Sequence, residues 1–193
     1  MTLLSKMGKL IEKISENCQK ISVQSAEEFI TAIMSARRVF VMGMGRSGLV
    51  ARAFAMRLMH LRLTVFVVGE TTTPAIGSGD LLIIVSGSGS TTSVVAIAKK
   101  ARELGARLAA ITSYPDSAVG RLSDVVVKIE GRLPEKRHDY PSRQLAGEHE
   151  PLTPMGTLFE LATMIFLDTV IEELMLRLGR TEEEMRRTHT QLE

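Results

Sequence analysis

Five short aliphatic runs, separated mostly by stretches of helical character, constrain the fold of this chain more than any other feature. The runs cover residues 38–42, 64–68, 80–85, 106–111 and 124–129. Four of them are almost continuously apolar, which is typical of strands that are covered on both faces. Helical stretches at 47–61 and 91–104 lie between neighbouring runs. This alternation predicts an α/β fold, a doubly wound five-stranded parallel sheet with helices on both faces and the flavodoxin-like strand order 2-1-3-4-5.

A helical segment precedes this alternating region, at about residues 1–36. Its apolar residues recur in steps of three and four, at Leu4, Met7, Ile11, Ile14, Cys18 and Ile21. Such a seam either packs on the chain's own core or pairs with a helix of another subunit. Ser25 and Glu28 have the spacing of a capping box, which predicts a second helix that starts after Ser25.

A long loop and a long helix follow the last aliphatic run. Residues 131–156 have no clear period and contain four prolines and many charges. A loop of this length is typical of a lid, a binding loop or a disordered segment. We expect a helix from about 157 to 178, and a last short helix that starts at the capping pair Thr181 and Glu184. The whole chain, residues 1–193, is expected to form a single domain.

Composition argues against several kinds of partner. The net charge of +2 is too small to favour nucleic acid or an anionic membrane. Cys18 is the only cysteine, so neither an intramolecular disulfide nor a cysteine-based zinc cluster can form. No apolar run reaches the roughly 18 residues that a membrane span needs. These features favour a cytoplasmic protein without nucleic-acid or membrane partners.

Two glycine- and serine-rich loops follow neighbouring strands of the expected sheet. The first strand ends in "GMGRSG" (43–48), and the third ends in "SGSGST" (86–91). In the order 2-1-3-4-5 the chain leaves strands one and three in opposite directions, so both loops face one crevice. Helix N-termini, close-approaching glycines and hydroxyl donors together predict a phosphate cradle there. Its expected residues are Gly45, Arg46, Ser47, Ser86, Gly87, Ser88, Gly89 and Thr91.

Two other interpretations compete with the phosphate cradle. The serines can cap helices and the glycines can form turns without any ligand. Gly43, Gly45 and Gly48 also match the dinucleotide fingerprint, with Glu70 at the end of the next strand as the ribose ligand. The dinucleotide interpretation is disfavoured because it does not explain "SGSGST" and leaves little chain for a substrate domain.

Both loops, taken with other segments, resemble the sugar isomerase (SIS) domain family, and most closely its 6-phospho-3-hexuloisomerases. The resemblance covers nearly the whole chain. It is carried by "RSGLVARAFAMRLMHL" (46–61), "VVGETTTP" (67–74), "GDLLIIVSGSGST" (79–91), "PMGTLFE" (154–160), "IFLD" (165–168) and "HTQLE" (189–193). The middle of the 131–153 loop is its least similar part.

The resemblance implies a function. It implies interconversion of D-arabino-3-hexulose 6-phosphate and fructose 6-phosphate, in formaldehyde fixation or pentose supply, with no cofactor and no metal. It also implies a homotetramer with sites near subunit interfaces, which would give the N-terminal seam a partner. Other phosphosugar aldose–ketose isomerases and non-catalytic sugar-phosphate sensors share such a cradle and stay open as alternatives.

Moving a carbonyl between carbons 3 and 2 through a cis-enediolate requires a base, an acid and donors for negative charge. Glu160, early in the expected last long helix, is the candidate base; otherwise it is a solvent-facing first-turn acid. His60 and His189 are the candidate acids, and a functional His189 would serve a neighbouring subunit. Arg46 could pair with phosphate or an oxyanion, and Glu70 could border the sugar hydroxyls.

Overall fold

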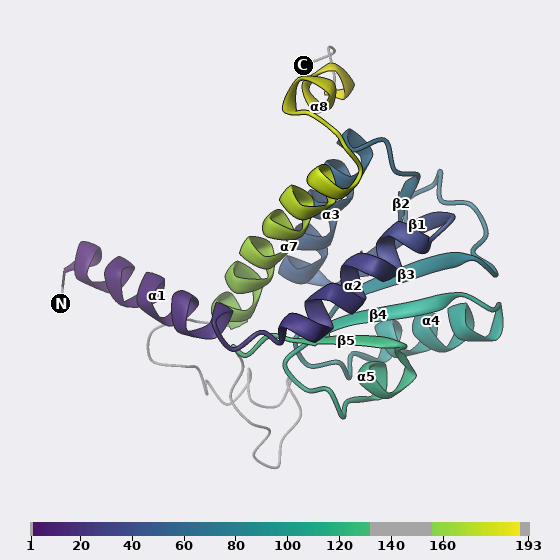
Figure 1. Ribbon diagram of the computed structural model, residues 1–193. Helices are drawn as coiled ribbons and strands as arrows, with labels where there is room; N and C mark the ends of the chain where they lie inside the picture. Colours follow the sequence, from purple (N-terminus) through teal and green to yellow (C-terminus); the bar gives the residue numbers. More distant parts are fainter. Residues whose placement is uncertain (1, 132–155, 190–193) are drawn as a thin grey trace.

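The computed structural model describes residues 2–131 and 156–189, and it contains a parallel sheet with helices on both faces (Figure 1). The strands are β1 (Arg38–Gly43), β2 (Val65–Val67), β3 (Asp80–Val85), β4 (Arg107–Thr112) and β5 (Val125–Lys128). Their order is β2-β1-β3-β4-β5, and every neighbouring pair is parallel. The predicted fold class and strand order are therefore confirmed.

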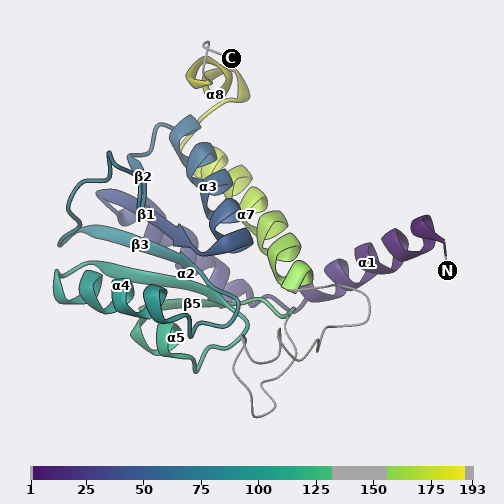
Figure 2. The ribbon, with the colours of Figure 1, turned by 180° about the vertical axis from the view of Figure 1, so that it is seen from behind.

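Two layers of helices cover the two faces of the sheet, as Figures 1 and 2 show from opposite sides. One layer contains α2 (Val23–Ser35), α3 (Gly45–His60) and α7 (Thr157–Arg177), and the other contains α4 (Thr92–Glu103) and α5 (Ala118–Leu122). Successive strand residues alternate between the layers, since Val39 and Val41 pack in the first core and Phe40 and Met42 in the second. This alternation explains why the strands are apolar throughout.

A buried carboxylate fixes the amino ends of the two central strands. Asp80 opens β3 and pairs in register with Arg38 of β1. The Arg38 guanidinium binds its carboxylate at 2.6 Å, and Arg37 binds it at 3.2 Å. The hydrogen bond from Arg38 holds the pKa of Asp80 below its ordinary value, against the effect of burial. These charges lie at the edge opposite the two glycine-rich loops.

The ends of several helices differ from the sequence-based expectation. The capping box at Ser25 is wrong, because α2 begins at Val23 and the Ser22 side chain accepts a hydrogen bond from the Ser25 amide. The capping box at Thr181 is confirmed for α8 (Glu182–Thr188). The short helix α5 was not predicted; it begins at Ala118, and the side chain of the preceding Ser117 caps it. Almost all of the expected lid, residues 132–155, lies outside the described residues.

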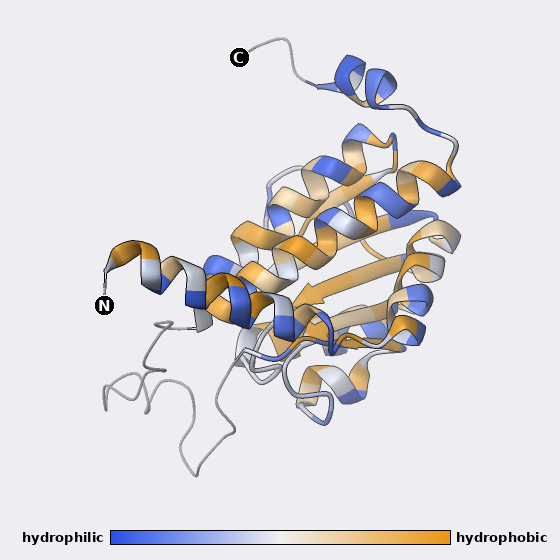
Figure 3. Ribbon diagram, turned by 60° about the vertical axis from the view of Figure 1, so that its left-hand side comes forward, coloured by the Kyte–Doolittle hydropathy of each residue, from blue (hydrophilic) through white to orange (hydrophobic). Residues whose placement is uncertain are grey.

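The apolar seam of the N-terminal helix α1 (Leu3–Cys18) packs on the chain's own core at its C-terminal end and is exposed at its N-terminal end. Ile14 is buried in the main core, and Cys18 and Ile21 pack against it. Leu4 and Ile11, nearer the N-terminus, are 76% and 64% exposed. Figure 3 shows hydrophobic turns on α1 where it projects from the rest of the chain. Within the described residues, no helix is long and apolar enough to cross a membrane.

Candidate functional site

The two glycine- and serine-rich loops lie side by side at the carboxyl edge of the sheet. Gly43 and Val85 end their strands and are register partners in the β1–β3 pair. From there the chain enters α3 on one face and α4 on the other. The crevice expected between strands one and three is thus flanked by "GMGRSG" and "SGSGST".

The three glycines of the first loop are required for two different reasons: close backbone packing at Gly43 and Gly48, and a left-handed backbone conformation at Gly45. A Cβ atom on Gly43 would lie 2.7 Å from the Ser47 backbone, and one on Gly48 would lie 2.7 Å from the Gly43 carbonyl oxygen. These two glycines therefore let the first turn of α3 pack directly on the end of β1. Gly45 has a φ of 56°, and a Cβ atom there would meet no neighbour within 4 Å. The space in front of Gly45 is thus open.

Hydrogen bonds to the carbonyl oxygens of the second loop anchor it to the segments after β4. The Gly87 oxygen accepts a hydrogen bond from the Ser113 amide, and the Gly89 oxygen accepts one from the Val119 amide. Gly89 has a φ of 59°, and a side chain there would overlap the Ser117 hydroxyl. These hydrogen bonds fix the conformation of the loop from the side of β4 and α5.

Three helices that begin near the ends of strands lack a side-chain cap. No side chain caps α3, α4 or α7, whose N-cap residues are Met44, Thr91 and Gly156. Side chains cap all the other described helices, through Thr2, Ser22, Ser117 and Thr181. The first-turn amides of the uncapped helices keep the positive end of the dipole available to an anion.

Hydroxyl groups surround the uncapped starts of α3 and α4. Ser47 and Ser86 are buried, at 5% and 6% exposure. The Ser86 hydroxyl accepts a hydrogen bond from the Gly89 amide, at 3.2 Å, and so shapes the loop. The Ser47 hydroxyl makes no hydrogen bond within the part of the chain that the structure describes. Ser88 is half-buried and Thr91 is exposed.

Glu160 and Arg46, 114 positions apart, form an ion pair at this edge. The Arg46 Nε lies 3.0 Å from Glu160 Oε2. The Glu160 side chain is 5% exposed, whereas that of Arg46 is 56% exposed. Glu160 is therefore not the solvent-facing acid of the alternative interpretation. The structure brings the candidate base next to the first glycine-rich loop.

Close backbone packing fixes the start of α7, and with it Glu160. Gly131, just after β5, has a φ of 145°, and a Cβ atom there would lie 2.7 Å from the Phe159 Cα. Phe159 is fully buried in the main core. Only a residue without a side chain allows this approach, so Gly131 positions the turn that carries Glu160.

Glu70 follows β2 and forms an ion pair with Arg52 of α3. Both side chains are about half exposed, so the pair is worth little in free energy and is easily separated. Glu70 thus lies on the carboxyl side of the sheet, as a residue bordering a substrate would.

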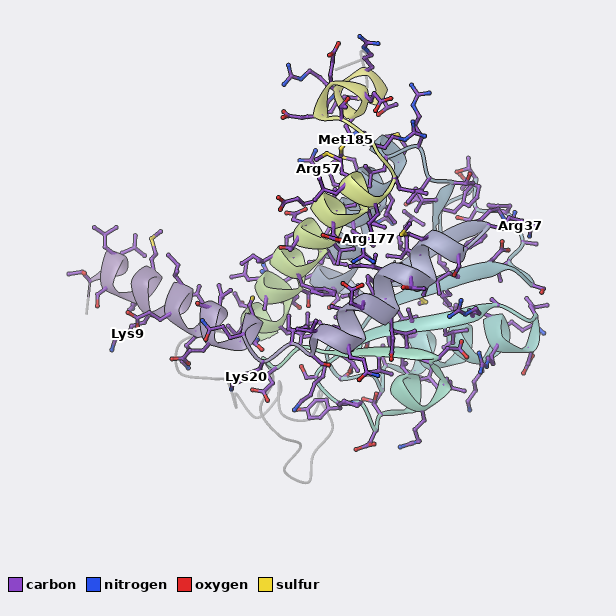
Figure 4. All side chains as sticks on the ribbon, viewed as in Figure 1. Lys9, Lys20, Arg37, Arg57, Arg177 and Met185 are labelled. Carbon is purple, nitrogen blue, oxygen red and sulfur yellow. The ribbon has the colours of Figure 1, made fainter. Side chains whose placement is uncertain are left out.

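His60 and His189 lie together but far from the two loops. Their ring centroids are 5.3 Å apart, and the Thr188 hydroxyl donates a hydrogen bond to the His60 carbonyl oxygen. Figure 4 shows Arg57 of α3 and Met185 of α8 at this same end of the molecule. Since α3 rises 1.5 Å per residue, about 20 Å separate Ser47 from His60. Within one chain, these histidines do not share a site with Glu160.

Metal ligation finds no support in the side-chain arrangement. No group of three or more His, Cys, Asp or Glu residues within 2–131 and 156–189 could hold a metal ion. His138 and His149, which the sequence places in the long loop, lie outside these residues.

The sequence alone did not indicate two supports of this site. One is the Arg46–Glu160 pair, because nothing in either segment points to the other. The second is Ser117, which lies against Gly89. Its side chain caps a short helix by accepting a hydrogen bond from the Gly120 amide three residues later. That N-cap spacing was the one sequence pattern that could have revealed it.

Comparison with known proteins yields both a family and close relatives. A family model described as the SIS domain matches residues 32–135. A Bacillus subtilis protein named 3-hexulose-6-phosphate isomerase is 37% identical over 187 residues, which cover 97% of both chains. A crystal structure from Methanococcus jannaschii, described as inferring a molecular function of 3-hexulose-6-phosphate isomerase, has a TM-score of 0.78 and 34% identity. It covers 98% of both chains.

More distant similarity extends to a regulator. The sugar isomerase domain of an RpiR transcription factor from Sphaerobacter thermophilus has a TM-score of 0.71 and 20% identity. The match covers 96% of this chain and 94% of that one. At this identity the likeness shows the fold alone, so the fold by itself does not separate an enzyme from a sensor.

Proposed function

Because this chain belongs to the SIS domain family, we propose that it is a phosphosugar isomerase, which interconverts D-arabino-3-hexulose 6-phosphate and fructose 6-phosphate. The observation that carries the proposal is the position of Glu160. This buried carboxylate pairs with Arg46 of the first glycine-rich loop, and the second loop follows the neighbouring strand at the same edge of the sheet. A sensor needs the anion site but has no use for a buried base next to it.

The phosphate group binds at the loops in this proposal. The uncapped starts of α3 and α4 supply amides, and Ser47, Ser88 and Thr91 supply hydroxyls. Binding the phosphate fixes the sugar carbons relative to Glu160, which turns proton transfer into a reaction between aligned groups.

The chemical step moves two protons and changes no oxidation state overall. Glu160 takes the proton from carbon 2 of the 3-hexulose, a C2=C3 double bond forms, and the carbon 3 carbonyl becomes an oxyanion. An acid protonates that oxygen. The oxygen on carbon 2 then loses its proton, the carbonyl forms at carbon 2, and carbon 3 receives a proton. A single carboxylic acid can carry the proton between the two carbons.

A second copy of the chain supplies the acid in this proposal, because His60 and His189 lie at the far end of α3. The helices α3 and α7 run side by side with the same direction (Figures 1 and 2). A two-fold axis perpendicular to them would set the histidine end of one copy against the Glu160 end of the other. Both sites of such a pair would be completed in trans.

The exposed surface of α3 and α7 supports such a pairing. On α3, Leu49 is 66% exposed and Met56 is 45% exposed. On α7, Ile165 is 47% exposed. Large apolar side chains on neighbouring helices favour burial against another protein surface. The homotetramer implied by the family resemblance would contain this interface and a second one.

Hydrogen exchange at carbon tests the proposed reaction. Purified protein is incubated with fructose 6-phosphate in deuterated water, beside a Glu160→Gln variant, and each carbon position is followed by NMR. We expect 3-hexulose 6-phosphate to form with deuterium at carbon 3 of fructose 6-phosphate and at carbon 2 of the 3-hexulose. The variant should lose at least about 100-fold in rate, the usual contribution of a general base.

Two other outcomes would redirect the proposal. Deuterium at carbon 1 would identify an aldose–ketose isomerase instead. Binding of fructose 6-phosphate without exchange at any carbon would identify a sensor that uses the same anion site without chemistry.

A further inference from the structure

The way Arg46 meets Glu160 bears on how the base works. We propose that Arg46 orients Glu160 and balances the negative charge that proton transfer moves, rather than binding the substrate phosphate. This inference rests on the proposed function, and it revises the sequence-based expectation that placed Arg46 in the phosphate cradle.

The first support is the geometry of the ion pair. Arg46 approaches through Nε, and no other hydrogen bond of its guanidinium is formed with a described residue. The carboxylate is 5% exposed, and a buried carboxylate without a partner is costly. Arg46 is the one cation paired with Glu160 among the described residues. Moving it onto a phosphate would leave the base uncompensated.

The second support is that the anion site has donors of its own. Two helix starts without a side-chain cap and the buried Ser47 hydroxyl lie at this edge of the sheet. Arg46 forms no hydrogen bond or ion pair with the described atoms of residues 86–91. A phosphate there can be bound by amides and hydroxyls alone, as at other helix N-termini.

The third support is the movement of charge during the reaction. When Glu160 takes the proton from carbon 2, it becomes neutral and the negative charge passes to the oxygen on carbon 3. The Arg46 guanidinium, 56% exposed and held at Nε, still has two terminal amino groups that can donate to this oxygen. The same cation thus compensates the Glu160 carboxylate before the proton transfer and the oxygen on carbon 3 after it.

Separate measurements of turnover and of phosphate binding test the proposal. The variants are Arg46→Gln, Arg46→Lys and, as a matched control, Arg177→Gln. Arg177 lies at the other end of α7, where it pairs with Glu173 and Glu27 (Figure 4). For each variant, kcat, KM and the inhibition constant of inorganic phosphate are measured.

For Arg46→Gln we expect kcat to fall about 100-fold, as for loss of a donor to an oxyanion. The KM and the phosphate inhibition constant should change less than about threefold, because Arg46 does not bind the phosphate in the ground state. Arg46→Lys should recover part of kcat, and Arg177→Gln should match the wild type. Phosphate inhibition weakened tenfold or more, with kcat near the wild-type value, would overturn the inference and return Arg46 to the cradle.

A stability cycle tests the pairing without any turnover. Denaturant unfolding is measured for Arg46→Gln, Glu160→Gln and the double variant. We expect Arg46→Gln to lower the unfolding midpoint in the wild type but scarcely in the Glu160→Gln background, since the charge it compensates is then gone. Equal effects in both backgrounds would overturn the pairing. A wild type without isomerase activity would instead overturn the proposed function, while this cycle still decides the pairing.

Discussion

Gly89 holds the second loop in a conformation that other residues avoid. Its φ is 59°, and a side chain would overlap the Ser117 hydroxyl behind it. We expect Gly89→Ala to lower the free energy of unfolding by about 3 kcal/mol, from the backbone conformation and the overlap together. Denaturant unfolding measures this loss, and inhibition by inorganic phosphate should weaken in the same variant because the loop must move.

Gly45 provides the matched comparison for Gly89. It has a similar φ, 56°, but a Cβ atom added there would have no other atom within 4 Å. We expect Gly45→Ala to cost only the backbone conformation, about 1–2 kcal/mol. Equal losses for the two alanine variants would show that the contact with Ser117 does not constrain the loop.

His60 makes stability depend on pH near neutrality. Burial lowers its pKa from 6.5, and the neighbouring His189 and Arg57 lower it further. The unfolded chain therefore binds a proton at this residue at higher pH than the folded chain does. The contribution of His60 to stability is complete above about pH 6.5 and is lost as pH falls toward its folded pKa.

We expect the free energy of unfolding to fall between about pH 7.5 and about pH 5.5, and to fall less in a His60→Gln variant. Unfolding in denaturant at both pH values measures the difference. Asp80 and Asp124, whose pKa values are lowered, lose their contributions only below about pH 4, so they do not interfere. The same slope in the variant and the wild type would exclude His60 as the source.

At the scale of elements, local sequence predicted the strands well because each strand is a short apolar run between polar turns. The run at 80–85 matches β3 residue for residue. The helix starts were harder, since several serines and threonines compete for each cap. At α2 the competition was between Ser22 and Ser25, three residues apart, and the structure uses Ser22.

The arrangement between elements was only partly predictable. Alternation of strand and helix, with the rule for parallel crossovers, placed both glycine-rich loops at one edge. The same reasoning does not say which residue of α7 meets which residue of α3. The Arg46–Glu160 pair depends on the close packing of Phe159, next to Glu160, against Gly131, which is far from both partners in sequence. Such contacts follow from tertiary packing and have no local pattern.

At the scale of the whole molecule, α3 acts as a spacer between two sets of chemical groups. Its start carries Arg46 and meets Glu160, and its end carries His60 beside His189. About 20 Å of helix keeps the sets apart. A chain that uses both sets in one reaction has to bring in a second copy, and the exposed apolar residues of α3 and α7 offer it a surface.

Complementation between inactive variants tests this use of a second copy. Glu160→Gln and His60→Asn are each expected to abolish turnover; if His60→Asn stays active, His189→Asn takes its place. When the two variants are unfolded together and refolded as a mixture, hybrid dimers hold one site with both wild-type groups and one site with neither. Half of randomly formed dimers are hybrids with one intact site of two, so activity should return to about a quarter of the wild-type value. Each variant refolded alone should stay inactive. Absence of recovery in mixed oligomers, confirmed by mass, would show that the histidines do not act across an interface between copies.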